Sequence, residues 1–393
     1  MRKALVNICV LLLFAACNEP ESMILSRMDI MASVDYADVD RTKTNCTVAI
    51  SEDNKTLYEG QATFHLRGNT TSGCPKRPFT VKLSEKTQLC GMPSAKSWVL
   101  LANYFDKTML RNALAFRMGV DSRLVWTPRF KFVELYYNGV RKGTYQLCEK
   151  VQVNNNRLNL PTDGWLVEID AKHAADDVFF ITEQIEQVIV FHEPEDTYLN
   201  EQMQVIATYF KEAEQALFSD DFTDSEKGWR HYLDEKSFID WYLINEIARN
   251  NDAIFFTSCF MHSGLDGKIC MGPLWDFDLG YGNSPYNESY QTKGWHVRNS
   301  KWYTRLFQDP SFMETVKKRF DYFYDRREMY YAYVRGQARE LAPSAKNNET
   351  IWNTMNVSLL ADIPVYGSYE KEVEGMIQWL EERFEWIKAE YGI

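Results

Sequence analysis

The sequence lacks several features that would place it in a known class at once. No two cysteines have CxxC spacing and the six histidines are scattered, which argues against a zinc site. No internal repeat or low-complexity segment is present. Positive charge is scarce, because 44 Lys and Arg stand against 55 Asp and Glu, for a formal net charge of -11. The average field of such a surface repels a nucleic-acid backbone, so a nucleic-acid partner is disfavoured.

Apolar and aromatic residues, by contrast, are plentiful. The chain has 393 residues, of which 45% are hydrophobic and 14% aromatic. This length suits one large bilobed domain or two ordinary ones, and the composition allows a sizeable buried core. Aromatic rings usually fill such cores, although surplus exposed rings often bind sugars or bases.

The first 17 residues resemble an export signal. Arg2 and Lys3 are followed by a short apolar run, Ala4–Phe14, and then by Ala16 and Cys17. The run is too short for a membrane span, which indicates a removable signal, and a cysteine after small residues resembles a lipobox. We therefore predict an exported, membrane-anchored bacterial lipoprotein, periplasmic or at the cell surface, lipidated at Cys17. The alternative is an ordinary secretory signal cut near Ala16.

Export would place the remaining cysteines in an oxidising compartment, where they could pair. Cys259 and Cys270 flank a predicted hairpin turn at Gly264–Gly267. They could therefore face each other across two strands, although a small shift in the turn would separate them.

The front half of the chain, after a predicted polar tether at 18–30, has the alternation of strands. Helical spacing interrupts it once, at Asp106–Met118, where Asp106 would cap the helix. The turn Asn138-Gly139 would join two later strands into a hairpin. We expect a mostly antiparallel sheet with one inserted helix, as a β-rich N-lobe over 31–160. The expected strands are Thr47–Ile50, Ala62–Leu66, Phe79–Leu83, Phe130–Tyr137 and Gly143–Glu149.

The rear half is mainly helical. Amphipathic helices are expected at Tyr198–Phe218 and Ser237–Arg249, and a long one near the end at Tyr369–Tyr391. A β segment at Trp165–Asp170 and two short strands, near Phe255–Met261 and Lys268–Met271, lie among them. A β-rich front and a helical rear, the latter a C-lobe over 161–393, indicate an α+β fold with two lobes.

Three clusters could perform chemistry. Asp252 follows a helix and precedes two short strands, where a cleft between lobes usually lies. Asp276 and Asp278 follow the second of those strands and could both coordinate a hard cation. Arg67 precedes Gly68, and Lys82 lies on the next strand; glycine lets the backbone approach a phosphate, and cations there neutralise its charge.

In this order, the clusters supply the parts needed for phosphoryl transfer: a phosphate-binding lysine, a proton-accepting aspartate and a metal-binding aspartate. Each also has a simpler interpretation. Asp252 could cap a loop, and Asp276 with Asp278 could be structural carboxylates or a calcium site. Arg67 could begin an ordinary turn, and Lys82 could be a solvated edge charge.

The residues described so far, with others between them, resemble the CotH kinase family. The resemblance runs from about residue 60 to 320, with a looser helical tail, and several motifs in one order are more specific than any one alone. The matching stretches are Leu66–Asn69, Lys76–Leu83, Trp98–Tyr104, Asp106–Asn112, Tyr136–Gly139, Gly143–Lys150, Asn245–Asn250 and Gly272–Asp278.

The resemblance implies an atypical protein-kinase-like fold that binds ATP with Mg²⁺ or Mn²⁺, in a family whose members include kinases of secreted proteins. It makes Asp252 the catalytic-loop aspartate, Asp276 a metal ligand and Asp278 a second possible ligand. The residues it implies for ATP binding are Arg67, Lys82, Arg111 and Glu149.

One position departs from the kinase pattern. Catalytic loops of kinases place an asparagine five residues after the aspartate, for a second metal ion, and Thr257 stands there. A hydroxyl can ligate magnesium but is a weaker ligand than an amide carbonyl, so we expect reduced metal affinity at Thr257.

We therefore predict an exported kinase that transfers phosphate from metal-bound ATP to Ser or Thr of an extracytoplasmic protein. The alternative is a catalytically degenerate lipoprotein that uses the same scaffold to bind a glycan or a protein. A hydrolase using Asp276 and Asp278 ranks last, because no nucleophile–histidine arrangement supports it.

Overall fold

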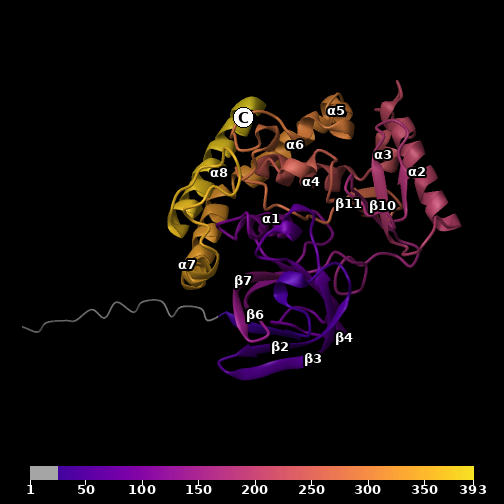
Figure 1. Cartoon of the computed structure of the whole chain (residues 1–393). Helices are drawn as coiled ribbons and strands as arrows, with labels where there is room; N and C mark the ends of the chain where they lie inside the picture. The colour runs from indigo at the N-terminus through magenta and orange to yellow at the C-terminus, as the bar shows by residue number, and fades with distance from the viewer. Residues whose placement is uncertain (1–24) are drawn as a thin grey trace, which may run out of the picture.

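The computed structural model describes residues 25–393, so the predicted signal peptide and the proposed lipidation at Cys17 lie outside the described residues. It confirms a mixed α+β fold, with a β-rich N-terminal part and helices concentrated in the C-terminal part (Figure 1). Between residues 25 and 393, no helix is both long and apolar enough to cross a bilayer.

The first seven strands close into a barrel in the order β1-β2-β3-β4-β5-β7-β6. Alternation along β4 explains the core, because Phe79, Val81 and Leu83 are buried inside while Lys82 is exposed outside. The barrel strands are β1 (Ser26–Ala32), β2 (Thr44–Glu52), β3 (Lys55–Leu66), β4 (Phe79–Thr87), β5 (Ala95–Leu101), β6 (Phe130–Tyr137) and β7 (Val140–Glu149).

The barrel closes through a parallel pairing of β1 with β6, in which Ile30 lies opposite Tyr137. This pairing corrects one expectation. Residues 26–30, assigned from the sequence to a tether, belong to β1; they pair with β6, and residues 27–30 pair with β2 as well. The hairpin β6–β7 has its predicted turn, where Asn138 and Gly139 both adopt the left-handed conformation that such tight turns require.

Helix α1 (Arg111–Val120) begins later than expected and belongs to the other core. Although it connects two barrel strands, Leu114 and Met118 pack in the hydrophobic cluster of the C-terminal part, next to α4 and α7. Asp106 does serve the helix start, because its carboxylate accepts a hydrogen bond of 3.0 Å from the backbone N–H of Arg111. The inserted helix therefore anchors the barrel to the C-terminal part.

The C-terminal part contains a second sheet, of order β12-β11-β8-β10-β9, surrounded by helices. Strands β9 and β10 were not expected from the sequence. The sheet has β8 (Leu166–Ile169), β9 (Phe179–Ile181), β10 (Val188–Glu193), β11 (Cys259–Ser263) and β12 (Ile269–Met271). The helices are α2 (Glu201–Phe218), α3 (Trp229–Tyr232), α4 (Glu235–Ala248), α5 (Lys301–Leu306), α6 (Pro310–Tyr324), α7 (Arg327–Trp352) and α8 (Tyr369–Tyr391).

Of the two possibilities for Cys259 and Cys270, the structure shows the one in which they do not face each other. The hairpin forms, but its register places Cys270 opposite His262, and Cys259 lies opposite Ile169 of β8. All six cysteines of the described residues are free thiols. Burial raises the pKa of the Cys270 thiol to about 12, so it is unreactive at neutral pH.

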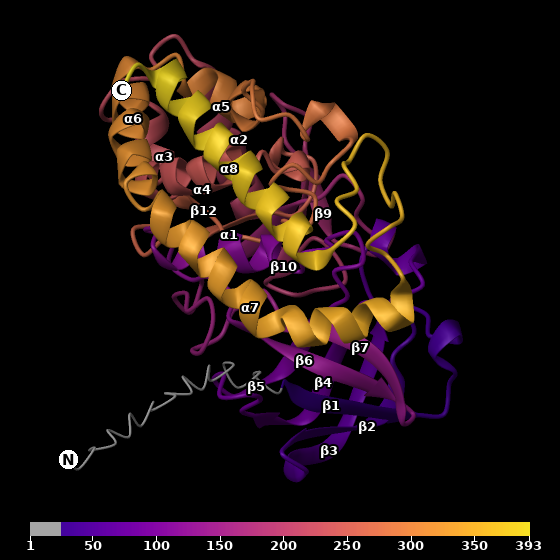
Figure 2. The same ribbon diagram turned by 90° about the vertical axis from the view of Figure 1, so that its left-hand side faces the viewer.

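Helix α7 joins the two parts from the outside. Figure 2 shows it lying along the barrel beside β6 and β7 before the chain turns back into α8. The backbone N–H of Thr144 donates to the side-chain oxygen of Asn348 at 3.2 Å, and the indole of Trp352 donates to the carbonyl of Lys142 at 3.0 Å. These contacts fix the barrel against the helices and hence fix the cavity between them.

Candidate active site

A cavity of about 740 Å³ lies between the barrel and the C-terminal part. Its volume is in the range of pockets that hold small molecules and cofactors. The barrel side includes Arg67, Gly68, Thr70, Thr71, Thr80, Val99 and Leu101, and α1 adds Asn112. The opposite side includes Glu168, Asp170, Lys172, His192, Asn251, Asp252, Thr257, Phe260, Trp275, Asp276 and Asp278.

Asp252 is delivered to the cavity by the end of α4. Arg249 takes the left-handed conformation that ends the helix, and a short 3-10 turn, Asn251–Ala253, follows. The side chain of Asn251 donates a hydrogen bond of 2.7 Å to the Asp252 carboxylate. Burial, with repulsion from Asp276, raises the pKa of Asp252 to about 6. A carboxylate with such a pKa can exchange a proton near neutral pH.

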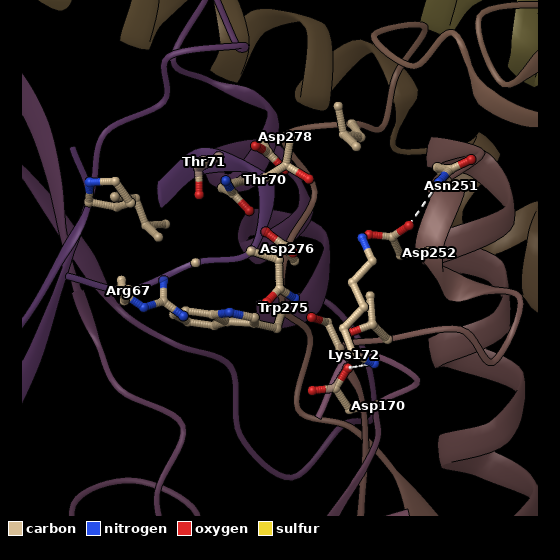
Figure 3. A pocket seen from close by; sticks show the side chains of 18 of the residues that line it. Arg67, Thr70, Thr71, Asp170, Lys172, Asn251, Asp252, Trp275, Asp276 and Asp278 are labelled. Carbon is tan, nitrogen blue, oxygen red and sulfur yellow. Dashed lines mark hydrogen bonds between the residues drawn. The ribbon is translucent and has the colours of Figure 1, made fainter. Parts of the chain in front are cut away.

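Asp276 and Asp278 follow β12 and point into the same cavity (Figure 3). The backbone between them is fixed, because the N–H of Phe277 donates 2.9 Å to the Asn112 side chain. Burial raises the pKa of Asp276, although the charge of Arg67 offsets part of that rise. Burial and repulsion from Asp276 raise the pKa of Asp278 well above its ordinary value. A cation bound between these two buried carboxylates would reduce the repulsion between them.

The donor set suits a divalent ion that also binds phosphate. Within residues 25–393, neither Asp276 nor Asp278 forms an ion pair, and no group of three or more His, Cys, Asp or Glu side chains forms a ready-made metal site. Mg²⁺ typically takes one or two carboxylates from the protein and fills its shell with water and substrate phosphates. Asp276 and Asp278 could therefore hold such an ion only together with further ligands.

The barrel contributes Arg67 and the turn after it. The Arg67 guanidinium lies 5.3 Å from the centre of the Trp275 ring, and Trp275 itself stacks on Phe116 of α1. Figure 3 shows Arg67 over the indole, across the cavity from Asp252. The indole is buried, so it packs and supports the arginine. A cation on the barrel side thus faces acids on the other.

The turn after Arg67 requires glycine. Gly68 has a φ of +84°, and a Cβ there would lie 2.3 Å from the Thr71 hydroxyl oxygen, at the cavity wall. Gly91 has a φ of +75° but, within the described part of the chain, no atom near an added Cβ. Both alanine variants should lose about 1–2 kcal/mol of unfolding free energy through left-handed strain. Urea denaturation should show a further loss only for Gly68→Ala, because Thr71 must move; equal losses would contradict this contact.

Three predicted ATP-binding residues lie outside the cavity lining. Lys82 points outward from β4 and is exposed. Arg111 is buried and bonds to the Asp106 carboxylate and, at 3.1 Å, to the carbonyl of Gly280. Glu149 is fully buried and forms an ion pair of 2.9 Å with Arg129. The structure brings together Arg67, Asp252, Thr257, Asp276 and Asp278.

A polar group on and after β8 was not predicted from the sequence. Glu168 accepts a hydrogen bond of 3.1 Å from the N–H of Ser258 and contacts His192 at 2.7 Å. Asp170 accepts one of 2.6 Å from the Thr257 hydroxyl, and Lys172 follows it. The one available signal was the position of Asp170 at a strand end, as for Asp276; nothing in the pattern indicated that β8 pairs with β11.

The order of these parts matches one known family over most of the chain. A family model described as CotH kinase protein matches residues 64–387. The chain belongs to the CotH kinase family. The match extends beyond the stretch in which the motifs were recognised, through the terminal helices to α8. Comparison with curated proteins gives no significant match.

The matched residues belong to both the barrel and the helical part, although β1, β2 and most of β3 precede them. The match includes both sides of the cavity, from β3 through Asp252 and Asp276 to α8. The match thus extends over most of the residues that the structure describes.

Proposed function

We propose that this CotH protein is an exported protein kinase, anchored through a lipidated Cys17, with the barrel and the helical part as the two lobes of a kinase-like fold. It would bind ATP with Mg²⁺ or Mn²⁺ and phosphorylate Ser or Thr of an extracytoplasmic protein. The observation that carries the proposal is the convergence of Arg67, Asp252, Asp276 and Asp278 on one cavity of about 740 Å³.

The chemistry assigned to each residue follows from its position. The acceptor hydroxyl oxygen forms a bond to the γ-phosphorus, the bond from that phosphorus to the bridging oxygen of ADP breaks, and the hydroxyl proton moves to Asp252. Asp276 and Asp278 would hold the divalent ion, which when bound offsets phosphate charge. Arg67 would contact the phosphates from the barrel side.

The competing proposal is a degenerate scaffold that binds a glycan or protein. One observation favours it: the Thr257 hydroxyl, at the position of a kinase metal ligand, is engaged by Asp170 at 2.6 Å. The raised pKa of Asp252 favours the enzyme, because a binding scaffold has no need of a proton acceptor beside two further acids.

Metal-dependent nucleotide binding tests the proposal directly. ATP with Mg²⁺ or Mn²⁺ should stabilise the purified chain by about 2.7 kcal/mol at one hundred times the dissociation constant, measured as a thermal shift. The double variant Asp276→Asn/Asp278→Asn should lose this shift while its own melting temperature rises, since the carboxylates repel each other. Asp163→Asn, at an exposed loop residue, is the control. A chain that shows no shift with either ion is not an ATP-dependent kinase.

A further inference from the structure

Lys172 lies in the turn directly after β8 and lines the cavity. Figure 3 shows its side chain extending from the Asp170 turn toward Asp252. In the described part of the chain it forms no ion pair. Its positive charge nevertheless acts on the site, because it lowers the pKa of both Asp252 and Asp276 against the effect of burial. An ammonium group held near several acids, yet paired with none, is available to an anionic ligand.

The turn that carries Lys172 is held on the segment after Asp252. The backbone N–H of Lys172 donates 2.8 Å to the Asp170 carboxylate, and the N–H of Ala171 donates 2.8 Å to the carbonyl of Phe256. The Lys172 amine also lies 5.2 Å from the centre of the Phe256 ring. The backbone position of the lysine is therefore fixed relative to the catalytic loop.

Thr257 completes this attachment. It is buried, and its hydroxyl donates 2.6 Å to the same Asp170 oxygen that receives the N–H of Lys172. In protein kinases the residue five positions after the catalytic aspartate is an asparagine that binds a second metal ion. Here Thr257 occupies that position, and its hydrogen bond to Asp170 fixes the turn that carries Lys172.

We propose that Lys172 is a catalytic residue that contacts the transferred phosphoryl group and replaces the second metal ion of other kinases. This rests on the proposed function, because it assigns a role within that cavity. Lys172 gives up no proton: its ammonium contacts a non-bridging phosphoryl oxygen while the acceptor proton still moves to Asp252. The ligand class is a polyphosphate, and the expected requirement is a single divalent ion.

The experiment compares Lys172→Met, Lys172→Arg and the control Lys96→Met, at an exposed lysine that does not line the cavity. Lys172→Met should lower kcat about 100-fold to 1,000-fold, as does loss of one transition-state donor, and Lys172→Arg should restore most of it. Calorimetry with inorganic tripolyphosphate and Mg²⁺ should show affinity about tenfold weaker for Lys172→Met, a difference of about 1.4 kcal/mol, since the variant loses a charge-assisted contact with phosphate. Lys96→Met should match wild type. Paramagnetic resonance should count a single Mn²⁺ per bound ATP.

The outcomes separate the two proposals. If wild type binds metal–ATP and transfers phosphate while Lys172→Met matches it in kcat and in tripolyphosphate affinity, the role of Lys172 is overturned and the kinase stands. Two Mn²⁺ ions per ATP overturn it equally. If no acceptor is phosphorylated, weaker tripolyphosphate binding by Lys172→Met supports its contact with phosphate but overturns its catalytic role. A wild-type chain that binds neither ligand overturns both.

Discussion

Asp252→Asn is expected to abolish phosphoryl transfer and, at neutral pH, to make the protein more stable. Loss of a general base typically costs about 100-fold to 10,000-fold in kcat. Binding of metal–ATP should survive, because the arginine and the acid pair that hold it are untouched and one negative charge near the phosphates is gone. The variant therefore separates binding from chemistry, which calorimetry and a phosphate-transfer assay measure independently.

The gain in stability follows from the raised pKa of Asp252. The pKa of Asp252 is about 6 in the folded chain, against 3.8 for an aspartate in the unfolded chain. At a pH between these two values, the folded state holds a proton that the unfolded state has released. Stability must then fall as pH rises through this window, and the full cost, on the order of 1–3 kcal/mol, is present above pH 6. Asparagine cannot ionise and avoids that cost.

The measurement is the melting temperature from pH 4 to pH 8. Asp252→Asn should exceed wild type at pH 8 and converge with it near pH 4, while Asp163→Asn should follow wild type throughout. The wild-type transfer rate should itself fall as pH drops through about 6, as Asp252 gains its proton. A variant that keeps the full transfer rate would show that another group accepts the proton.

The parts of the fold that depend on contacts between neighbouring residues were predictable from the sequence. The hairpin β6–β7 follows from Asn138-Gly139, whose left-handed conformations few other residue pairs adopt readily. The two aspartates separated by the hairpin β11–β12 were likewise placed correctly in one cavity. The barrel closure was not predictable, because the parallel pairing of β1 with β6 joins strands about a hundred residues apart and leaves no local pattern.

The site was predictable only where a side chain follows directly from its element. Lys82 was correctly placed on a strand, but alternation alone cannot say which outward-facing residue borders a cavity, and Thr80 does so instead. Arg111 and Glu149 were expected in the cleft, yet each is buried beside an opposite charge. The role of Lys172 could not be predicted, because its position in the cavity depends on the long-range pairing of β8 with β11.

The loop that carries Asp252 is stabilised by a buried positive charge on α8. Arg383 of α8 is fully buried and donates 2.7 Å to the carboxylate of Glu246, on the helix that ends just before Asp252. It also donates to the carbonyls of Thr292 and Gly294, at 3.0 and 2.8 Å. One guanidinium therefore ties α4, α8 and the loop between them together.

Glu246 is held by further hydrogen bonds. Its two carboxylate oxygens also accept hydrogen bonds of 2.9 and 2.8 Å from the N–H groups of His296 and Arg298. Removing Arg383 would leave the Glu246 carboxylate buried without a cation, which costs far more than the pair contributes when intact.

Arg383→Met should therefore lower the unfolding free energy by about 3–5 kcal/mol, the range for breaking a buried ion pair on one side. The matched control is Arg335→Met, because Arg335 of α7 pairs with Glu374 of α8 at 3.1 Å with both side chains about half exposed. Exposed pairs contribute about 0.2–1 kcal/mol. Urea denaturation of the two variants measures the contrast, and equal losses would contradict a stabilising role for the buried pair. Since Glu246 lies on the helix that delivers Asp252, the same variant should lose transfer activity at temperatures where the control retains it.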